Sequence, residues 1–505
     1  MKHIMLMKKC ILFFSAIACA ISANAQLDKE LSNLTTNLEE IGVLKNLTSK
    51  EIESSKLGIG FETLDRKVFE PSNFYENVGK IGVKWARCQT GWARTETEKG
   101  KYDFAWLDDV VDNLLKRGIQ PWFNVGYGNP IYMGEIKGNP TAVGHIPLYY
   151  GEECEQAWKN YVKALASHFK GRVKHFEIWN EPEIKQFWQP KGADPLEYAR
   201  LIKITADEIK SVYPEAIIGA CSAGVYVDKY VEKLMATDVA KSLDFYSVHN
   251  YCLMPEINFQ NYINALRVLM KKNGVKAQIW QGETGFPSYA PPTSWVRKSW
   301  AWHSSNETMQ AKSMLRRYIT DLRSGLDHTS FFMVTDFSPS YVKGDGNGMS
   351  DEAVWGIFEN KEGYRPKKVF YVMRNFCSMF SNKTKLADYT FTLNLNRLYP
   401  TQTPVSRLGM FAALSNLTSF ERNGYPVYCY YMPEDPQLQM RTIENIVLQQ
   451  KGQNKFKNPV LIDMMTGKVY RIKTNGAYLG GLPVTDYPLF VTDLDAISDI
   501  FVPKK

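Results

Sequence analysis

The sequence predicts an α/β fold, a (β/α)8 barrel, followed by a smaller all-β sandwich domain. Three observations lead to this fold class: the length of the chain, an alternation of apolar runs with amphipathic segments, and a change of pattern near residue 380. The chain has 505 residues, of which 44% are hydrophobic and 23% charged. This is an ordinary globular balance, and the length allows more than one domain.

Eight short apolar runs are expected to form the strands of the barrel, and segments with helical periodicity lie between them. One such segment, Leu107 to Leu115, has Asp103 as its expected N-cap and Gly118 as its expected stop. Eight strand-then-helix units are what a (β/α)8 barrel requires. A doubly wound open sheet is the alternative, but the chain has neither a G-x-G-x-x-G nor a Walker motif. The expected strands are Leu57–Glu62, Val83–Thr90, Ile119–Gly126, Val173–Glu181, Ala216–Ala223, Leu243–Tyr251, Ala277–Glu283 and Thr329–Asp336.

The segments outside the barrel have different patterns. Residues 26–56 are polar and helix-prone, and we expect them to form an N-terminal arm that packs on the fold. The barrel is expected over 57–382 and the β-sandwich over 383–505, where turn signals separate short strand-like runs. The runs expected as strands in that domain are Tyr389–Leu395, Met410–Leu417, Tyr425–Tyr431, Val460–Met464, Val469–Ile472 and Leu489–Thr492.

The first 25 residues have the pattern of a secretory signal peptide. Three lysines lie within the first nine residues, Cys10 to Ile21 is apolar, and Ala23-Asn24-Ala25 is a small-x-small cleavage signal. We therefore expect a secreted or periplasmic protein. An alternative is that Ala16 to Cys19 forms a lipobox, with Cys19 carrying a lipid anchor. No later segment is long and apolar enough to be a transmembrane span.

Charge and cysteine content exclude some classes of function. Removing the signal lowers the formal net charge from +8 to +5, and the basic residues form no run, which argues against nucleic acid as a partner. The six remaining cysteines form no C-x-x-C pair, and their spacing suits no zinc site, so we expect no metal and no cofactor. A disulfide between Cys221 and Cys252, which fall on successive expected strands, stays open.

Two glutamates carry the strongest chemical signal. Glu181 ends the run His175-Phe176-Glu177-Ile178-Trp179-Asn180-Glu181, and Glu283 ends Ile279-Trp280-Gln281-Gly282-Glu283. A carboxylate at the mouth of a buried strand is costly unless it is paired or used. Two carboxylates on converging strands are what cleavage of a glycosidic bond requires. Further polar or aromatic residues expected at the same end of the barrel are Arg87, Gln89, Asn124, Tyr127, Trp179, Asn180, His249, Asn250, Tyr251 and Asp336.

These motifs resemble those of glycoside hydrolase clan A, and within the clan those of family 39 and related families. The resemblance covers residues 57–505 and implies that Glu181 is the general acid/base and Glu283 the nucleophile. It also implies that Asn180 binds the sugar 2-hydroxyl and that Arg87 keeps the nucleophile charged. The chain departs from many clan members at the end of the eighth strand, where Asp336 or Phe337 stands in place of a tryptophan.

The resemblance implies that His249 and Tyr251 orient the substrate and the nucleophile; purely structural roles for Arg87, His249 and Tyr251 are the alternatives. As substrate-binding candidates we also keep Asn124, Trp179 and Asp336. The expected function is that of a secreted retaining glycosidase acting on a carbohydrate substrate, with exo-cleavage of a β-linked sugar favoured. The alternatives are an endo-acting hydrolase, a transglycosylase, and a non-catalytic glycan-binding protein. The sugar, the linkage and the oligomeric state have no signature in the sequence.

Overall fold

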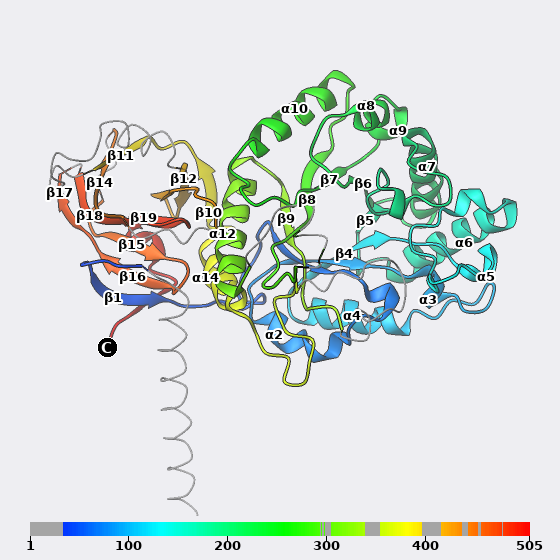
Figure 1. The fold of residues 1–505 in the computed structure, drawn as a ribbon, viewed down its shortest axis with the longest axis horizontal. Coiled ribbons are helices and arrows are strands. Elements are labelled where there is room, and N and C mark those ends of the chain that lie inside the picture. Colours follow the sequence, from blue (N-terminus) through cyan, green and yellow to red (C-terminus); the bar gives the residue numbers. More distant parts are fainter. Residues whose placement is uncertain are drawn as a thin grey trace, which may run out of the picture.

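The computed structural model describes residues 34–292, 294, 297, 305–338, 354–395, 416–436, 443–452, 456–476 and 478–505. Figure 1 shows two bodies, a barrel with its surrounding helices and a smaller β domain, with the helices α12 and α14 where they meet. The expected fold class, a (β/α)8 barrel with an all-β domain, is confirmed. The expected signal peptide, including Cys19, lies outside the described residues.

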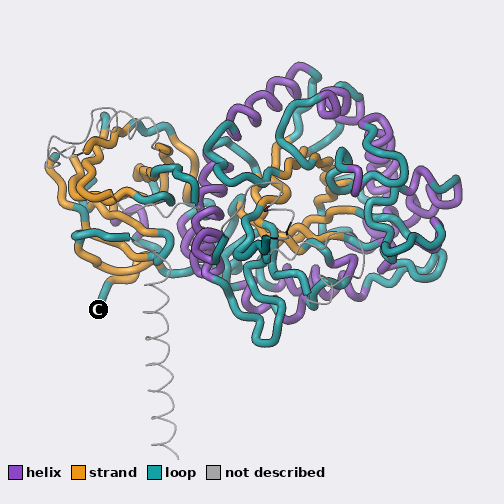
Figure 2. Tube along the Cα trace, viewed as in Figure 1, coloured by secondary structure: helices purple, strands orange, loops and turns teal. Residues whose placement is uncertain are grey.

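Eight parallel strands close the barrel in the order β2 to β9, and they form the central ring of Figure 2. Each strand overlaps one of the eight expected apolar runs, with ends that differ from the expected ones. Strands buried on both faces have near-continuous apolar sequences, which is why these runs were recognisable. The bounds are β2 Leu57–Phe61, β3 Trp85–Gln89, β4 Gln120–Val125, β5 His175–Ile178, β6 Ile217–Ser222, β7 Phe245–His249, β8 Gln278–Thr284 and β9 His328–Phe331.

Helices cover the outside of the ring (Figure 2). The helix α4 buries the stripe expected between Leu107 and Leu115, with Leu115 itself only partly buried. The Asp103 side chain accepts a hydrogen bond from the Ala105 backbone N–H at 2.9 Å, and the chain leaves the helix through Gly118 at φ 76°. The helices are α2 Tyr75–Gly79, α3 Trp92–Thr95, α4 Ala105–Lys116, α5 Pro130–Met133, α6 Glu152–Phe169, α7 Pro195–Val212, α8 Lys229–Met235, α9 Asp238–Lys241, α10 Phe259–Lys272, α12 Glu307–Arg323 and α14 Lys368–Met379.

The β domain consists of two antiparallel sheets, ordered β10-β12-β13-β19-β15-β16-β1-β20 and β11-β14-β18-β17. The expected strand Tyr425–Tyr431 coincides with β13, whereas most of the expected strand Met410–Leu417 lies outside the described residues. The bounds are β10 Thr384–Ala387, β11 Phe391–Leu395, β12 Asn416–Arg422, β13 Tyr425–Tyr431, β14 Ile443–Gln450, β15 Pro459–Asp463, β16 Lys468–Arg471, β17 Lys473–Asn475, β18 Tyr478–Val484, β19 Leu489–Asp493 and β20 Phe501–Pro503.

The N-terminal arm contains a strand where the sequence suggested helix. β1, Glu39–Leu44, lies between β16 and β20 and pairs antiparallel with both. A Cβ built on Gly42 would fall 2.2 Å from the carbonyl oxygen of Val502, so glycine allows this close pairing. Pairing with distant strands has overridden the local preference. The limits assigned to the domains stay a prediction.

The helix α12 is buried along most of its length although it is polar. Every residue from Met309 to Asp321 is buried, including lysine, arginine and aspartate side chains. The helix is packed between the barrel and the β domain (Figure 1), which explains why it has no solvent-facing side over this stretch. Within the described part of the chain, no helix combines the length and apolarity needed to cross a bilayer.

Candidate active site

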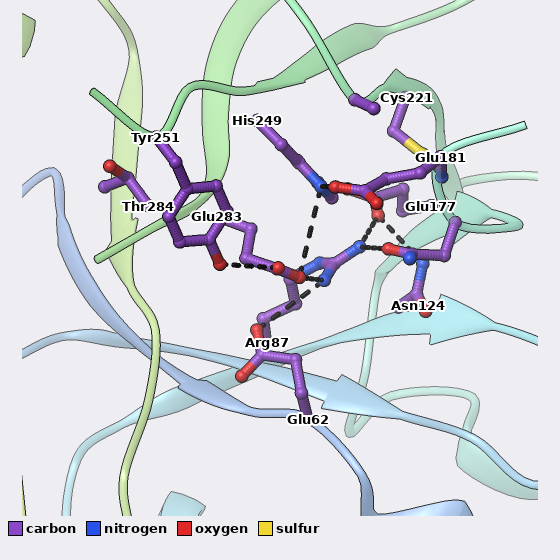
Figure 3. Close-up of polar contacts among 12 residues, drawn as sticks. Glu62, Arg87, Asn124, Glu177, Glu181, Cys221, His249, Tyr251, Glu283 and Thr284 are labelled. Atoms are coloured by element: carbon purple, nitrogen blue, oxygen red, sulfur yellow. Dashed lines mark hydrogen bonds and ion pairs between the residues drawn. The ribbon is translucent and has the colours of Figure 1, made fainter. Parts of the chain in front are cut away.

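Arg87 lies at the centre of the polar cluster in the barrel and is fully buried on β3 (Figure 3). Its guanidinium donates to Glu283 Oε2 and to Asn180 Oδ1, each at 2.9 Å, and it forms a close ion pair with Glu177. Glu62 Oε1 lies 3.5 Å from the same guanidinium. This delocalised, permanently charged group faces the buried carboxyl groups of Glu62 and Glu177 and the partly buried one of Glu283. It compensates negative charge that would otherwise be costly to bury.

Glu181 lies on the turn that follows β5, in a left-handed backbone conformation with φ 44°. Its Oε1 is 2.9 Å from Nδ1 of His249, a buried residue of β7. Burial raises the pKa of Glu181 to about 7; Arg87 opposes this rise and Glu177 adds to it. A carboxyl group with this pKa holds a proton near neutral pH, which is what a general acid needs.

Glu283 lies near the end of β8 and accepts two hydrogen bonds from charged or polar donors. Arg87 donates to Oε2, and the Tyr251 hydroxyl donates to Oε1 at 2.6 Å. An oxygen of Glu283 and an oxygen of Glu181 lie within 4.8 Å of each other. This bound on the nearest oxygens is compatible with the carboxyl separation of about 5–5.5 Å that retaining glycosidases have.

Three of the expected site residues hold the turn after β5 in place. Asn124 donates from its amide to Glu177 Oε1 at 2.8 Å and to the carbonyl oxygen of Trp179 at 2.6 Å. The indole N–H of Trp179, which is fully buried, donates to the Phe187 carbonyl at 2.7 Å. Asn180 accepts from Arg87. Asn124 and Trp179 therefore position Glu181, and direct contact of these three residues with a sugar stays a prediction.

Asp336 is engaged with residues other than the glutamate pair. It accepts from the Lys367 ammonium at 2.6 Å and from the backbone N–H of Gly356 at 2.8 Å. Both Asp336 and Lys367 are buried, so the pair resembles a structural ion pair that fixes the chain after β9. Contact of Asp336 with substrate stays a prediction.

Two buried carboxyl groups in the cluster were not selected from the sequence. Glu177 lies within β5 and is fully buried against Arg87. Glu62 follows β2, and burial together with the nearby Glu283 raises its pKa well above the usual value although Arg87 opposes the rise. Glu62 is the last residue of the expected strand Leu57–Glu62. Polar residues at the C-terminal ends of barrel strands are the expected site residues, and this criterion could have identified Glu62.

Cys221 and Cys252, the two cysteines near the site, form no disulfide. Cys221 donates to the Trp179 carbonyl at 3.4 Å and Cys252 to Asn250 Oδ1 at 3.2 Å, and both are free thiols.

Two sets of side chains have potential metal-ligand atoms within 4.8 Å of one another. They are Glu181 with His249 and Glu283, and Glu177 with Cys221 and His249. Arg87 supplies positive charge to one carboxylate of each set, Glu283 in the first and Glu177 in the second.

Part of this chain is similar in sequence to known proteins. Residues 77–307 match the family described as Glycosyl hydrolases family 39. The chain is 29% identical over 165 residues to a β-xylosidase of Geobacillus stearothermophilus, an alignment that covers 30% of this chain and 31% of the relative. It is 28% identical over 195 residues to a β-xylosidase of Caldicellulosiruptor saccharolyticus, covering 34% and 37%. The chain thus spans about a third of the length of these relatives.

Solved structures share the fold over most of its length. A family 39 β-xylosidase from Caulobacter crescentus aligns with a TM-score of 0.55 at 15% identity, covering 89% of this chain and 97% of that one. A family 39 enzyme from Xanthomonas axonopodis pv. citri aligns with a TM-score of 0.54 at 13% identity, covering 91% and 98%. At these identities the structures establish the shared fold.

Proposed function

The chain resembles glycoside hydrolase family 39 of clan A, and from this we propose that it is a retaining glycosidase that removes β-linked xylose from the end of a glycan. One observation carries the proposal. Two glutamates have oxygens within 4.8 Å of each other, and their surroundings differ. Burial favours the proton on Glu181, whereas the donors Arg87 and Tyr251 compensate the charge of Glu283.

The reaction follows from this arrangement in two steps. Glu283 attacks the anomeric carbon while Glu181 transfers its proton to the departing glycosidic oxygen, so that a glycosyl–enzyme ester forms as the glycosidic bond breaks. Glu181, now ionised, then takes a proton from a water molecule that attacks the same carbon. The ester bond to Glu283 breaks, and the sugar leaves with its original configuration.

The choice of xylose rests on the curated relatives, two of which are β-xylosidases. Exo action is supported by the long connection between β4 and α6. Its residues 144–146 bond to the loop after β5: the Ile146 N–H donates to the Gln189 carbonyl at 3.0 Å, and the Gln189 N–H to that of Gly144 at 2.7 Å. The connection is thus tied to the loop that bears Glu181, and we propose that it closes one side of the site, which favours cleavage at a chain end.

Export is part of the proposal and rests on the signal-like pattern of residues 1–25. A secreted enzyme processed after Ala25 begins at Gln26. Mass spectrometry of the protein from its native host identifies this N-terminal residue. A lipid-modified N-terminus at Cys19 would replace secretion by membrane anchoring.

The decisive experiment compares two variants that differ only in which glutamate is removed. Wild type is screened against aryl β-xylosides, galactosides, glucosides, arabinosides and glucuronides, and proton NMR records the first anomer released. Glu283→Ala and Glu181→Ala are then assayed with sodium azide. Loss of the nucleophile leads to the α-glycosyl azide, whereas loss of the acid/base leads to the β-glycosyl azide, because azide then attacks the glycosyl–enzyme ester.

Each other result rejects a stated part of the proposal. Release of the inverted anomer removes the nucleophile role from Glu283. An excess of transfer products over free sugar identifies a transglycosylase. Binding of oligosaccharides without turnover of any glycoside identifies a glycan-binding protein on this scaffold.

A further inference from the structure

The connection between β7 and α10, residues 250–258, carries part of the catalytic machinery. We call it the β7–α10 loop. It begins directly after His249, the partner of Glu181, and it contains Tyr251, whose hydroxyl donates to Glu283 at 2.6 Å. A displacement of this loop would therefore disturb the surroundings of both glutamates.

The start of the loop is fixed from outside the barrel by Arg317 of α12. Its guanidinium donates to Asn250 Oδ1 at 2.8 Å, and it also donates to Asp321 one turn further along the helix. The backbone carbonyl of Asn250 accepts from the Thr284 hydroxyl at 2.9 Å, and Thr284 is the neighbour of Glu283. Asn250 thus connects α12 to the residue beside the proposed nucleophile.

The far end of the loop is fixed by Arg316, the adjacent residue of α12. Arg316 binds both carboxylate oxygens of Glu256, at 2.7 and 2.9 Å. Burial alone would raise the pKa of Glu256, but Arg316 holds it below the usual value, so the pair is ionised. Bidentate arginine–carboxylate pairs define orientation as well as distance.

The β domain completes this contact. The hydroxyl of Tyr431, on β13, donates to Glu256 Oε1 at 2.8 Å. Arg316 donates in addition to the backbone carbonyl of Glu434, just after β13, at 2.6 Å. The β7–α10 loop, α12 and the β domain therefore meet at one buried carboxylate, in the region where Figure 1 shows α12 between the two bodies.

We propose that Tyr431 and Glu256 are positioning residues for the active site, so that the β domain holds the β7–α10 loop in the conformation that places Tyr251 and His249 on the two glutamates. The inference rests on the proposed function for its kinetic consequence. It assigns to the β domain a part in catalysis that requires no sugar to bind there.

Tyr431→Phe tests the proposal with a minimal change, because it removes one hydroxyl and keeps the ring. We expect kcat on an aryl β-xyloside to fall by about threefold to tenfold while KM changes by less than about twofold, as for a loss of positioning in the transition state. Hydrogen exchange of the backbone amides in residues 250–258, measured by mass spectrometry without substrate, should become faster.

The matched control is Asp486→Asn. Asp486 accepts from Lys312 of α12 at 2.8 and 3.0 Å, so this variant breaks a buried ion pair between the same helix and the same domain without touching the loop. It should lower the melting temperature and leave both kcat and loop exchange unchanged. The double variant Tyr431→Phe with Glu256→Ala should exchange no faster than Glu256→Ala alone, because without the Glu256 carboxylate the Tyr431 hydroxyl has no contact left to lose.

The outcomes separate this inference from the proposed function. Faster loop exchange in Tyr431→Phe, absent in Asp486→Asn, supports the inference even if no glycoside is turned over by the wild type. Unchanged exchange in Tyr431→Phe overturns it, and so does an equal increase in the two variants. Faster exchange with unchanged kcat would show that the contact holds the loop without serving catalysis, which also overturns it.

Discussion

The raised pKa of Glu181 leads to a prediction about stability that is independent of any substrate. In the folded protein this pKa is about 7, whereas an exposed glutamate has a value of 4.5. The folded state therefore holds the proton more tightly than the unfolded state does. The stability contributed by this proton is complete below about pH 4.5 and is lost as the pH rises through about 7. Glu181→Gln cannot ionise, so it avoids this loss.

The size of this stability change follows from the difference between the pKa of Glu181 in the folded protein and that of an exposed glutamate. At about 1.4 kcal/mol for each pH unit, the gap corresponds to about 3 kcal/mol. Relative to wild type, Glu181→Gln should gain about 3 kcal/mol in unfolding free energy between about pH 4 and about pH 8.5. Urea denaturation of both proteins at the two pH values measures this. A difference between the proteins that stays constant with pH would refute the assignment of a buried, protonated Glu181.

Three further variants test individual contacts. Tyr251→Phe removes a donor to Glu283 and should lower kcat/KM by about tenfold, and an unchanged value would exclude a role in holding the nucleophile. Arg87→Met leaves Glu177 as an uncompensated buried charge and should cost about 3–5 kcal/mol in urea denaturation; a loss below that of an exposed ion pair would contradict the cluster. Asp336→Asn should lower the melting temperature with kcat and KM within about twofold of wild type, whereas a raised KM at unchanged stability would indicate sugar contact.

The barrel could be predicted because its strands are buried on both faces and therefore have uninterrupted apolar sequences. The exact ends of the strands could not. The run Val173–Glu181 has the composition of one strand, yet β5 ends at Ile178. The chain then adopts left-handed conformations at Trp179 and Glu181, with φ 68° and 44°. Tertiary contacts impose these conformations, and neither residue type favours them.

The two proposed catalytic glutamates were identifiable because each follows an apolar run and stands in a distinctive motif. Glu177 was not, although it lies four residues before Glu181. A carboxylate inside an apolar run indicates a break in the strand unless its ion-pair partner is known. The partner of Glu177 is Arg87, which is 90 positions away. The same reasoning applies to Glu256, because its partners Arg316 and Tyr431 are remote in sequence from it and from each other.

The pairing of β1 with β16 and β20 has a consequence for how the protein assembles. Glu39 bonds to Arg471 across 432 positions of the chain. During synthesis the segment with β1 must stay unpaired until both partner strands have left the ribosome, so the larger sheet can close only after the chain has been made through Pro503. For an enzyme exported as proposed above, this delay leaves the larger sheet open while the chain is threaded through a translocation channel.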